Sequence, residues 1–82
     1  MTKIGKLHAR LVAGSSLSFA EFCRLLEAFG YRHVRTAGSH RIYRHVTTGD
    51  TRVVQPNGKS AKRYQVDQFV DKIEQLGLTL DE

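Results

Sequence analysis

A glycine, a serine and a histidine stand together at Gly38-Ser39-His40, within a segment rich in arginine. Gly38 permits a positive φ, and Ser39 can hydrogen-bond locally and fix a turn. An imidazole gains and loses a proton near neutral pH, so His40 beside a bound phosphate can serve as a general acid or base. The residues alone leave an alternative open, in which glycine and serine only form a hairpin turn and His40 is a polar residue that opens a strand.

A second group of basic residues occurs at Lys59-Ser60-Ala61-Lys62-Arg63, where the pattern predicts the start of a helix. Free backbone amides and the helix dipole favour an anion at such a position, and the three basic side chains would add to the attraction. Phosphate is the natural ligand. The alternative is a solvated run of charge.

Three residues near these segments extend the candidate nucleic-acid surface. Arg41 directly follows the histidine and would help to hold a phosphate and stabilise developing charge. Tyr43 and Tyr64 have rings that can stack on unpaired bases, although packing is the commoner role of aromatic residues in such positions. Tyr43 is also a candidate for the second proton-transfer group.

The four histidines do not have the spacing of a metal site. His40 and His45 are five residues apart on one predicted strand, so their side chains point to opposite faces. His8 is distant, and a pair formed by His33 and His40 lacks a nearby carboxylate or thiolate. We therefore expect no metal and no cofactor.

The chain has 82 residues and a net charge of +5, which is typical of a protein that binds a polyanion or an acidic partner. Residues 31–64 hold eight Lys or Arg and one acidic residue. The single cysteine, Cys23, excludes an intramolecular disulfide and is expected to be a buried apolar residue. Nothing resembles a signal peptide or approaches the roughly 20 apolar residues of a membrane span, so we expect a soluble cytoplasmic protein with no membrane partner.

The hydrophobic pattern predicts an α+β protein with one additional helix at its N-terminus. Helical periodicity predicts a short amphipathic helix over residues 3–13 and two helices with one apolar face each over residues 18–29 and 62–76. Three short strands of an antiparallel meander are predicted at residues 31–36, 40–46 and 51–55. Both longer helices need one apolar sheet face, but the alternation does not identify which face is buried.

Local signals define where the predicted elements begin and end. Ser18 and Glu21 have the spacing of a capping box at the start of the second helix. Ser60 is the expected N-cap of the last helix, and Gly77 ends it. After the third strand, Pro56-Asn57-Gly58 is expected to turn the chain.

From about Phe19 to Leu78 the chain resembles the HicA-type toxins of bacterial type II toxin-antitoxin modules. The residues that carry the resemblance are Leu25-Leu26, Phe29-Gly30-Tyr31, Arg35, Gly38-Ser39-His40, Ile42-Tyr43, Pro56-Asn57-Gly58-Lys59 and Leu76-Gly77-Leu78. Many relatives carry a second histidine directly after the motif histidine, where this chain has Arg41.

The resemblance implies a double-stranded-RNA-binding-domain-like fold, α-β-β-β-α, with both helices on one face of a three-stranded antiparallel sheet. It would span residues 18–82, with residues 1–17 as an N-terminal helical extension. It also implies a ribonuclease that cleaves mRNA, with His40 as the catalytic residue, and a HicB-type antitoxin that covers this surface. The expected RNA contacts are Gly38, Ser39, Arg41, Tyr43, Lys59, Lys62 and Arg63.

Metal-independent transesterification fits these expectations, because the ribose 2′-OH is a nucleophile that RNA itself carries. The competing interpretation is a non-catalytic module of the double-stranded-RNA-binding type, which reads duplex shape and leaves the RNA intact.

Overall fold

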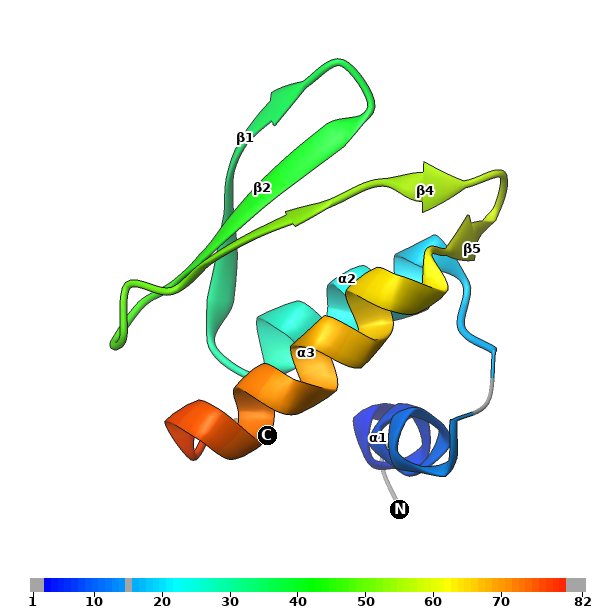
Figure 1. Cartoon of the computed structure of the whole chain (residues 1–82), viewed down its shortest axis with the longest axis vertical. Helices are drawn as coiled ribbons and strands as arrows, with labels where there is room; N and C mark the ends of the chain where they lie inside the picture. Colours follow the sequence, from blue (N-terminus) through cyan, green and yellow to red (C-terminus); the bar gives the residue numbers. More distant parts are fainter. Residues whose placement is uncertain (1–2, 15, 80–82) are drawn as a thin grey trace.

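A computed structural model of the protein describes residues 3–14 and 16–79. Within these residues the chain forms three helices, a three-stranded sheet and a small hairpin (Figure 1). In chain order the elements are α1 (Lys3–Ala13), α2 (Phe19–Ala28), β1 (Tyr31–Ala37), β2 (His40–His45), β3 (Thr51–Val54), β4 (Pro56–Asn57), β5 (Ser60–Ala61) and α3 (Arg63–Leu76). The predicted helices and the three predicted strands are confirmed, with ends that differ by no more than one residue.

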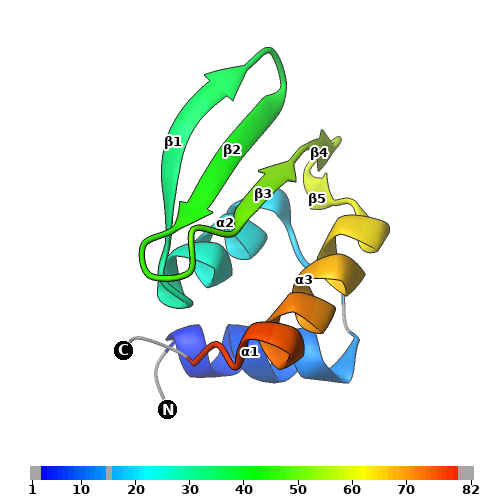
Figure 2. The ribbon, with the colours of Figure 1, turned by 60° about the vertical axis from the view of Figure 1, so that its left-hand side comes forward.

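The sheet has the order β1-β2-β3, and all its neighbouring strands are antiparallel. Helices α2 and α3 lie on one side of it, and α1 lies at the base of the molecule, away from the turn between β1 and β2 (Figures 1 and 2). The α+β architecture with helices on one face is therefore confirmed.

The sheet face that packs on the helices contains Tyr31, Tyr43 and Val54, which are almost completely buried. The ring of Tyr31 meets that of Phe69 in α3 edge to face, with 5.8 Å between ring centroids. Side chains alternate along a strand, so burial of Tyr43 places the side chains of Arg41 and His45 on this inner face and those of His40, Ile42 and Arg44 on the outer face.

The start of α2 is held by the predicted capping box. Ser18 Oγ accepts a hydrogen bond from the Glu21 amide at 3.1 Å, and the Ser18 amide donates to Glu21 Oε1 at 2.9 Å. Arg10 of α1 donates to Glu21 Oε2 at 2.7 Å, so α1 is tied to the same corner. Leu7 and Leu11 of α1 are buried in the hydrophobic core, which α1 therefore shares with the other two helices.

The predicted turn after β3 is part of a hairpin that the sequence did not reveal. Strand β4 pairs antiparallel with β5, which leaves Gly58 and Lys59 as the two loop residues. Gly58 has a φ of +64°, as the first position of such a loop requires. The turn is therefore present, but it begins one residue later than Asn57-Gly58 would indicate.

The prediction that Ser60 caps α3 is wrong. Ser60 lies in β5 with an extended backbone and forms an isolated bridge with Ser18. The N-cap is Lys62, which makes no side-chain capping hydrogen bond. The predicted C-terminal end is confirmed, because Gly77 is left-handed with a φ of +62° and its amide bonds the Ile73 carbonyl. Among the described helices, none has the length and apolar character needed to cross a membrane.

Candidate nucleic-acid interface

The turn before His40 is a tight hairpin loop of two residues, Gly38 and Ser39, because Ala37 pairs with His40. Gly38 has a φ of +61°, and no non-glycine residue in the described part of the chain has a positive φ. A positive φ at only the first loop position is the pattern of a type II′ turn. A Cβ atom on Gly38 would meet nothing within 4 Å, so the backbone angle alone requires glycine here.

The imidazole of His40 is exposed on the outer face of the sheet, directly after this turn. Within residues 3–14 and 16–79, no side chain or backbone group makes a hydrogen bond or ion pair with it. The turn lies at the end of the molecule opposite α1 (Figure 2). His40 is therefore available to a large substrate, as an acid or base acting on RNA must be.

A chain of hydrogen bonds joins the turn to the start of α3. Gln55 Nε2 donates to Ser39 Oγ at 3.2 Å, and Lys62 Nζ donates to Gln55 Oε1 at 3.1 Å. The backbone amide of Gln55 donates to Oε1 of the buried Gln65 at 2.9 Å. Two predicted site residues, Ser39 and Lys62, are thus brought together by a third residue, Gln55, which no sequence pattern identifies.

A groove opens on the other side of the turn, lined by Ser39, Arg41 and Lys59 with residues from the start of α2. The guanidinium carbon of Arg41 lies 5.3 Å from the centre of the Phe19 ring. The Lys59 carbonyl accepts a hydrogen bond from the Phe19 amide at 2.9 Å, which fixes the β4–β5 loop against α2. Arg41 and Lys59 therefore share one groove, although Arg41 and His40 occupy opposite faces of β2.

Tyr43 does not have the surroundings that its predicted role requires. Its side chain is 2% exposed, so the ring offers no free face to a base. Burial raises the pKa of Tyr43 to about 12, which also argues against proton transfer near neutral pH. Tyr64, at the start of α3, is 56% exposed and remains available for stacking.

Arg63 is directed away from the His40 turn. Its guanidinium donates to the Gly14 carbonyl at 2.8 Å, and Nε lies 3.3 Å from Asp67 Oδ1. The first contact joins the start of α3 to the residue that follows α1, and the second is an ion pair within α3. The structure does not bring Arg63 together with the other predicted RNA contacts.

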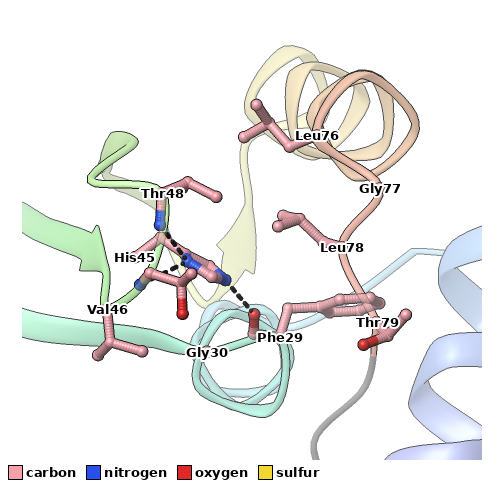
Figure 3. Close-up of a pocket in the computed structure, with 10 residues that line it drawn as sticks. Phe29, Gly30, His45, Val46, Thr48, Leu76, Gly77, Leu78 and Thr79 are labelled. Atoms are coloured by element: carbon pink, nitrogen blue, oxygen red, sulfur yellow. Dashed lines mark hydrogen bonds between the residues drawn. The ribbon is translucent and has the colours of Figure 1, made fainter.

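His45 is a structural residue (Figure 3). Its Nδ1 accepts from the Thr47 and Thr48 amides at 3.1 Å each, and its Nε2 lies 2.8 Å from the Phe29 carbonyl. A nitrogen that accepts two hydrogen bonds carries no proton, so Nε2 is the donor to Phe29. A Cβ on Gly30 would lie 2.8 Å from Nε2. The described residues contain no group of three or more His, Cys, Asp or Glu side chains that could hold a metal ion.

The order α-β-β-β-α, with both helices on one sheet face and basic groups around the hairpin end, defines a small protein of the double-stranded-RNA-binding-domain-like class. A family model described as "HicA toxin of bacterial toxin-antitoxin" matches residues 19–78. The chain therefore belongs to the HicA toxin family, the toxin component of bacterial toxin-antitoxin systems. No curated protein and no solved structure matches it. Helix α1 precedes the matched range.

Proposed function

We propose that this protein is an endoribonuclease toxin that cleaves single-stranded mRNA, with His40 as the catalytic residue. The observation that supports this most strongly is the free, exposed imidazole directly after the Gly38-Ser39 turn. It lies within residues 31–64, which hold eight Lys or Arg and one acidic residue. Family membership supports the same activity, because HicA toxins are ribonuclease-type toxins.

The reaction needs only groups that RNA and the protein supply. A base takes the proton of a ribose 2′-OH, whose oxygen attacks the adjacent phosphorus. The P–O2′ bond forms, the P–O5′ bond breaks, and an acid gives a proton to the departing 5′-oxygen. His40 would act as the base or the acid, a role that contributes roughly 10²- to 10⁴-fold to the rate.

The phosphate would be held by cations around the turn, only two of which line the groove. Lys62 is connected to Ser39 through Gln55, and Arg41 and Lys59 line the neighbouring groove. Such fixed donors stabilise charge that develops on the phosphoryl oxygens. Gly38 and Ser39 would contribute by holding the turn. Tyr43 and Arg63 are not included, because Tyr43 is buried and Arg63 is bonded to the Gly14 carbonyl after α1.

The proposed setting is a toxin-antitoxin module in the cytoplasm. A HicB-type antitoxin would neutralise the protein by covering the surface around His40, and a basic surface favours an acidic partner. The proposed functional unit is residues 18–82, with residues 1–17 as an extension. The protein produced without its antitoxin would then degrade mRNA and arrest growth.

The test compares wild-type protein with His40→Ala on single-stranded RNA, and in cells in which RNA integrity and growth are followed together. Wild type should cleave, and His40→Ala should be slower by about 10²- to 10⁴-fold. His33→Ala is the control, because His33 is an exposed histidine of β1 whose imidazole lies against Tyr43 and bonds Thr36 Oγ1 at 2.7 Å rather than standing free after the turn. Equal rates for wild type and His40→Ala would remove His40 from the chemistry. Intact RNA together with salt-sensitive duplex binding would indicate the non-catalytic module instead.

A further inference from the structure

The outer face of the sheet carries three exposed polar side chains at neighbouring positions of β1 and β2, which we call the outer-face row: Arg35, His40 and Arg44. In the register of β1 and β2, Arg35 pairs with Ile42, which lies between His40 and Arg44 on the same face. Arg35 is therefore the diagonal neighbour of both. Diagonal cross-strand neighbours are about 7–8 Å apart, which is within reach of an arginine side chain.

The two arginines of this row have free guanidinium groups. Neither side chain makes a hydrogen bond, ion pair or ring contact with any residue of the described chain. The other described arginines of the sheet differ: Arg32 donates to the Glu27 carbonyl, Arg41 lies over a ring, and Arg52 pairs with Asp50 at 3.2 Å. The guanidinium groups left free in the sheet are thus on the face that carries His40.

No acidic residue of the described sheet and its loops balances this charge on the outer face. The one acidic residue within residues 31–64 is Asp50, which accepts from the Tyr31 hydroxyl at 2.7 Å and pairs with Arg52. Arg44 even stands opposite Arg32, a cross-strand pair of like charge that is unfavourable without an anion nearby. An external polyanion would therefore neutralise the positive charge on this face.

We propose that the outer-face row binds the phosphate backbone of the substrate RNA beyond the cleavage point, so that the strand passes over the turn and continues along the sheet from His40 towards Arg44. This inference rests on the proposed function, since it takes His40 to mark the reacting phosphate. Guanidinium groups bind phosphate through paired N–H donors, and two such groups on neighbouring strands can bind separate phosphates of one RNA strand. Ile42 and the half-exposed Val53 beside it offer an apolar surface to bases.

The experiment measures binding of a labelled single-stranded RNA of about 20 nucleotides in a His40→Ala background, in which bound RNA is not consumed. The double variant Arg35→Gln/Arg44→Gln should bind about 10-fold or more weakly. The slope of the logarithm of the RNA binding constant against the logarithm of salt concentration should become shallower by about 1.4, because each lost phosphate contact on a single strand removes about 0.7. Arg35→Lys/Arg44→Lys, which keeps the charge, should retain the slope and lose part of the affinity.

The matched control is Lys6→Gln/Arg24→Gln, which removes the same charge from exposed side chains of α1 and α2 that have no partner among the described residues. It should change RNA binding by less than about 2-fold. Equal losses in the two double variants would reduce the effect to net charge and overturn the inference. Unchanged RNA binding would overturn it too. The same variants are also tested for binding to a polyglutamate peptide. If Arg35→Gln/Arg44→Gln weakens binding to the peptide as much as binding to RNA, the surface fits an acidic protein and the inference is overturned.

The experiments distinguish a failure of the ribonuclease assignment from a failure of the outer-face row as an RNA-binding surface. If the protein with His40 intact does not cleave RNA but the row variants lose RNA binding, the ribonuclease assignment fails and the binding surface stands. If wild type cleaves, His40→Ala does not, and the row variants bind RNA normally, only the outer-face row is wrong. Circular dichroism of each variant confirms the fold, which exposed substitutions should leave intact.

Discussion

Gln55 Nε2 donates a hydrogen bond to Ser39 Oγ at 3.2 Å, and this contact joins the turn before His40 to the segment that leads into the β4–β5 hairpin. The same side chain accepts from Lys62 Nζ at 3.1 Å. Gln55 thereby connects the glycine-serine-histidine turn, which carries part of the family resemblance, to the basic segment before α3. It acts on both through its side chain while its backbone amide is held by Gln65.

Replacing Gln55 with alanine should weaken catalysis more than stability. The turn and Lys62 would lose their common partner, and cleavage should fall about 2- to 10-fold, corresponding to the usual net value of one hydrogen bond. The melting temperature should change little, because the Gln55 side chain is only partly buried and its backbone bond is kept. The measurement is kcat and KM for RNA cleavage beside a thermal melt. Gln75→Ala, an exposed glutamine of α3, is the control, and equal cleavage by both variants would contradict a positioning role.

Sequence patterns predicted the elements closely because their signals are local. The capping box needs only Ser18 and Glu21, three residues apart, and the end of α3 needs only Gly77. The small β4–β5 hairpin was missed because two-residue strands carry no periodic pattern. Its formation depends on the distant residues Leu17 and Phe19, which bond the backbone of Ala61 and Lys59.

The candidate site was predictable only in part, for the same reason. His40 stands out by its neighbours in the sequence, whereas Gln55 contacts Ser39 across 16 positions and has no distinctive context. The burial of Tyr43 could not be predicted, because alternation along β2 is obscured by polar residues on both faces. His45 can face the core only because the Phe29 carbonyl and two loop amides satisfy its ring, and no strand pattern reveals such partners.

Replacing the two histidines of β2, His40 and His45, should have different effects on the free energy of unfolding. His45→Ala would leave the Phe29 carbonyl and two amides without their partner and open a cavity beneath the β2–β3 loop, so unfolding free energy should fall by about 2–4 kcal/mol. His40→Ala removes an exposed ring with no partner among the described residues and should change it by less than about 0.5 kcal/mol. Urea unfolding of both variants gives the comparison. A similar loss from both would mean that His40 is structural.

Helix α1 should contribute to the stability of the whole domain although the family match begins after it. Leu11 is 3% exposed within the shared core, and its neighbour Val12 is 70% exposed. Leu11→Ala should therefore lower the unfolding free energy by about 2–5 kcal/mol, whereas Val12→Ala should change it by less than about 0.5 kcal/mol. Single urea transitions monitored by circular dichroism test this. A negligible loss in Leu11→Ala would show that α1 is dispensable for the fold.

The capping carboxylate of α2 should make stability depend on pH below neutrality. The hydrogen bond from the Ser18 amide, with help from Arg10, holds the pKa of Glu21 below its usual value of 4.5. Because the pKa of Glu21 is lower in the folded state, the ionised carboxylate adds to the free energy of unfolding. This contribution is complete above pH 4.5 and is lost as the pH falls through the folded-state pKa. Glu21→Gln keeps an acceptor for the Ser18 amide but removes the charge.

This variant should be less stable than wild type by about 0.5–1 kcal/mol near neutral pH, through the loss of the partly exposed ion pair with Arg10 and of a favourable charge at a helix start. The difference should shrink steadily below pH 4.5 and vanish in strong acid, where wild-type Glu21 is itself protonated. Urea unfolding across this pH range measures it. Glu74→Gln, at an exposed glutamate of α3, is the control for the removal of one negative charge. A constant gap between wild type and Glu21→Gln at all pH values would exclude the charge of Glu21 as its source.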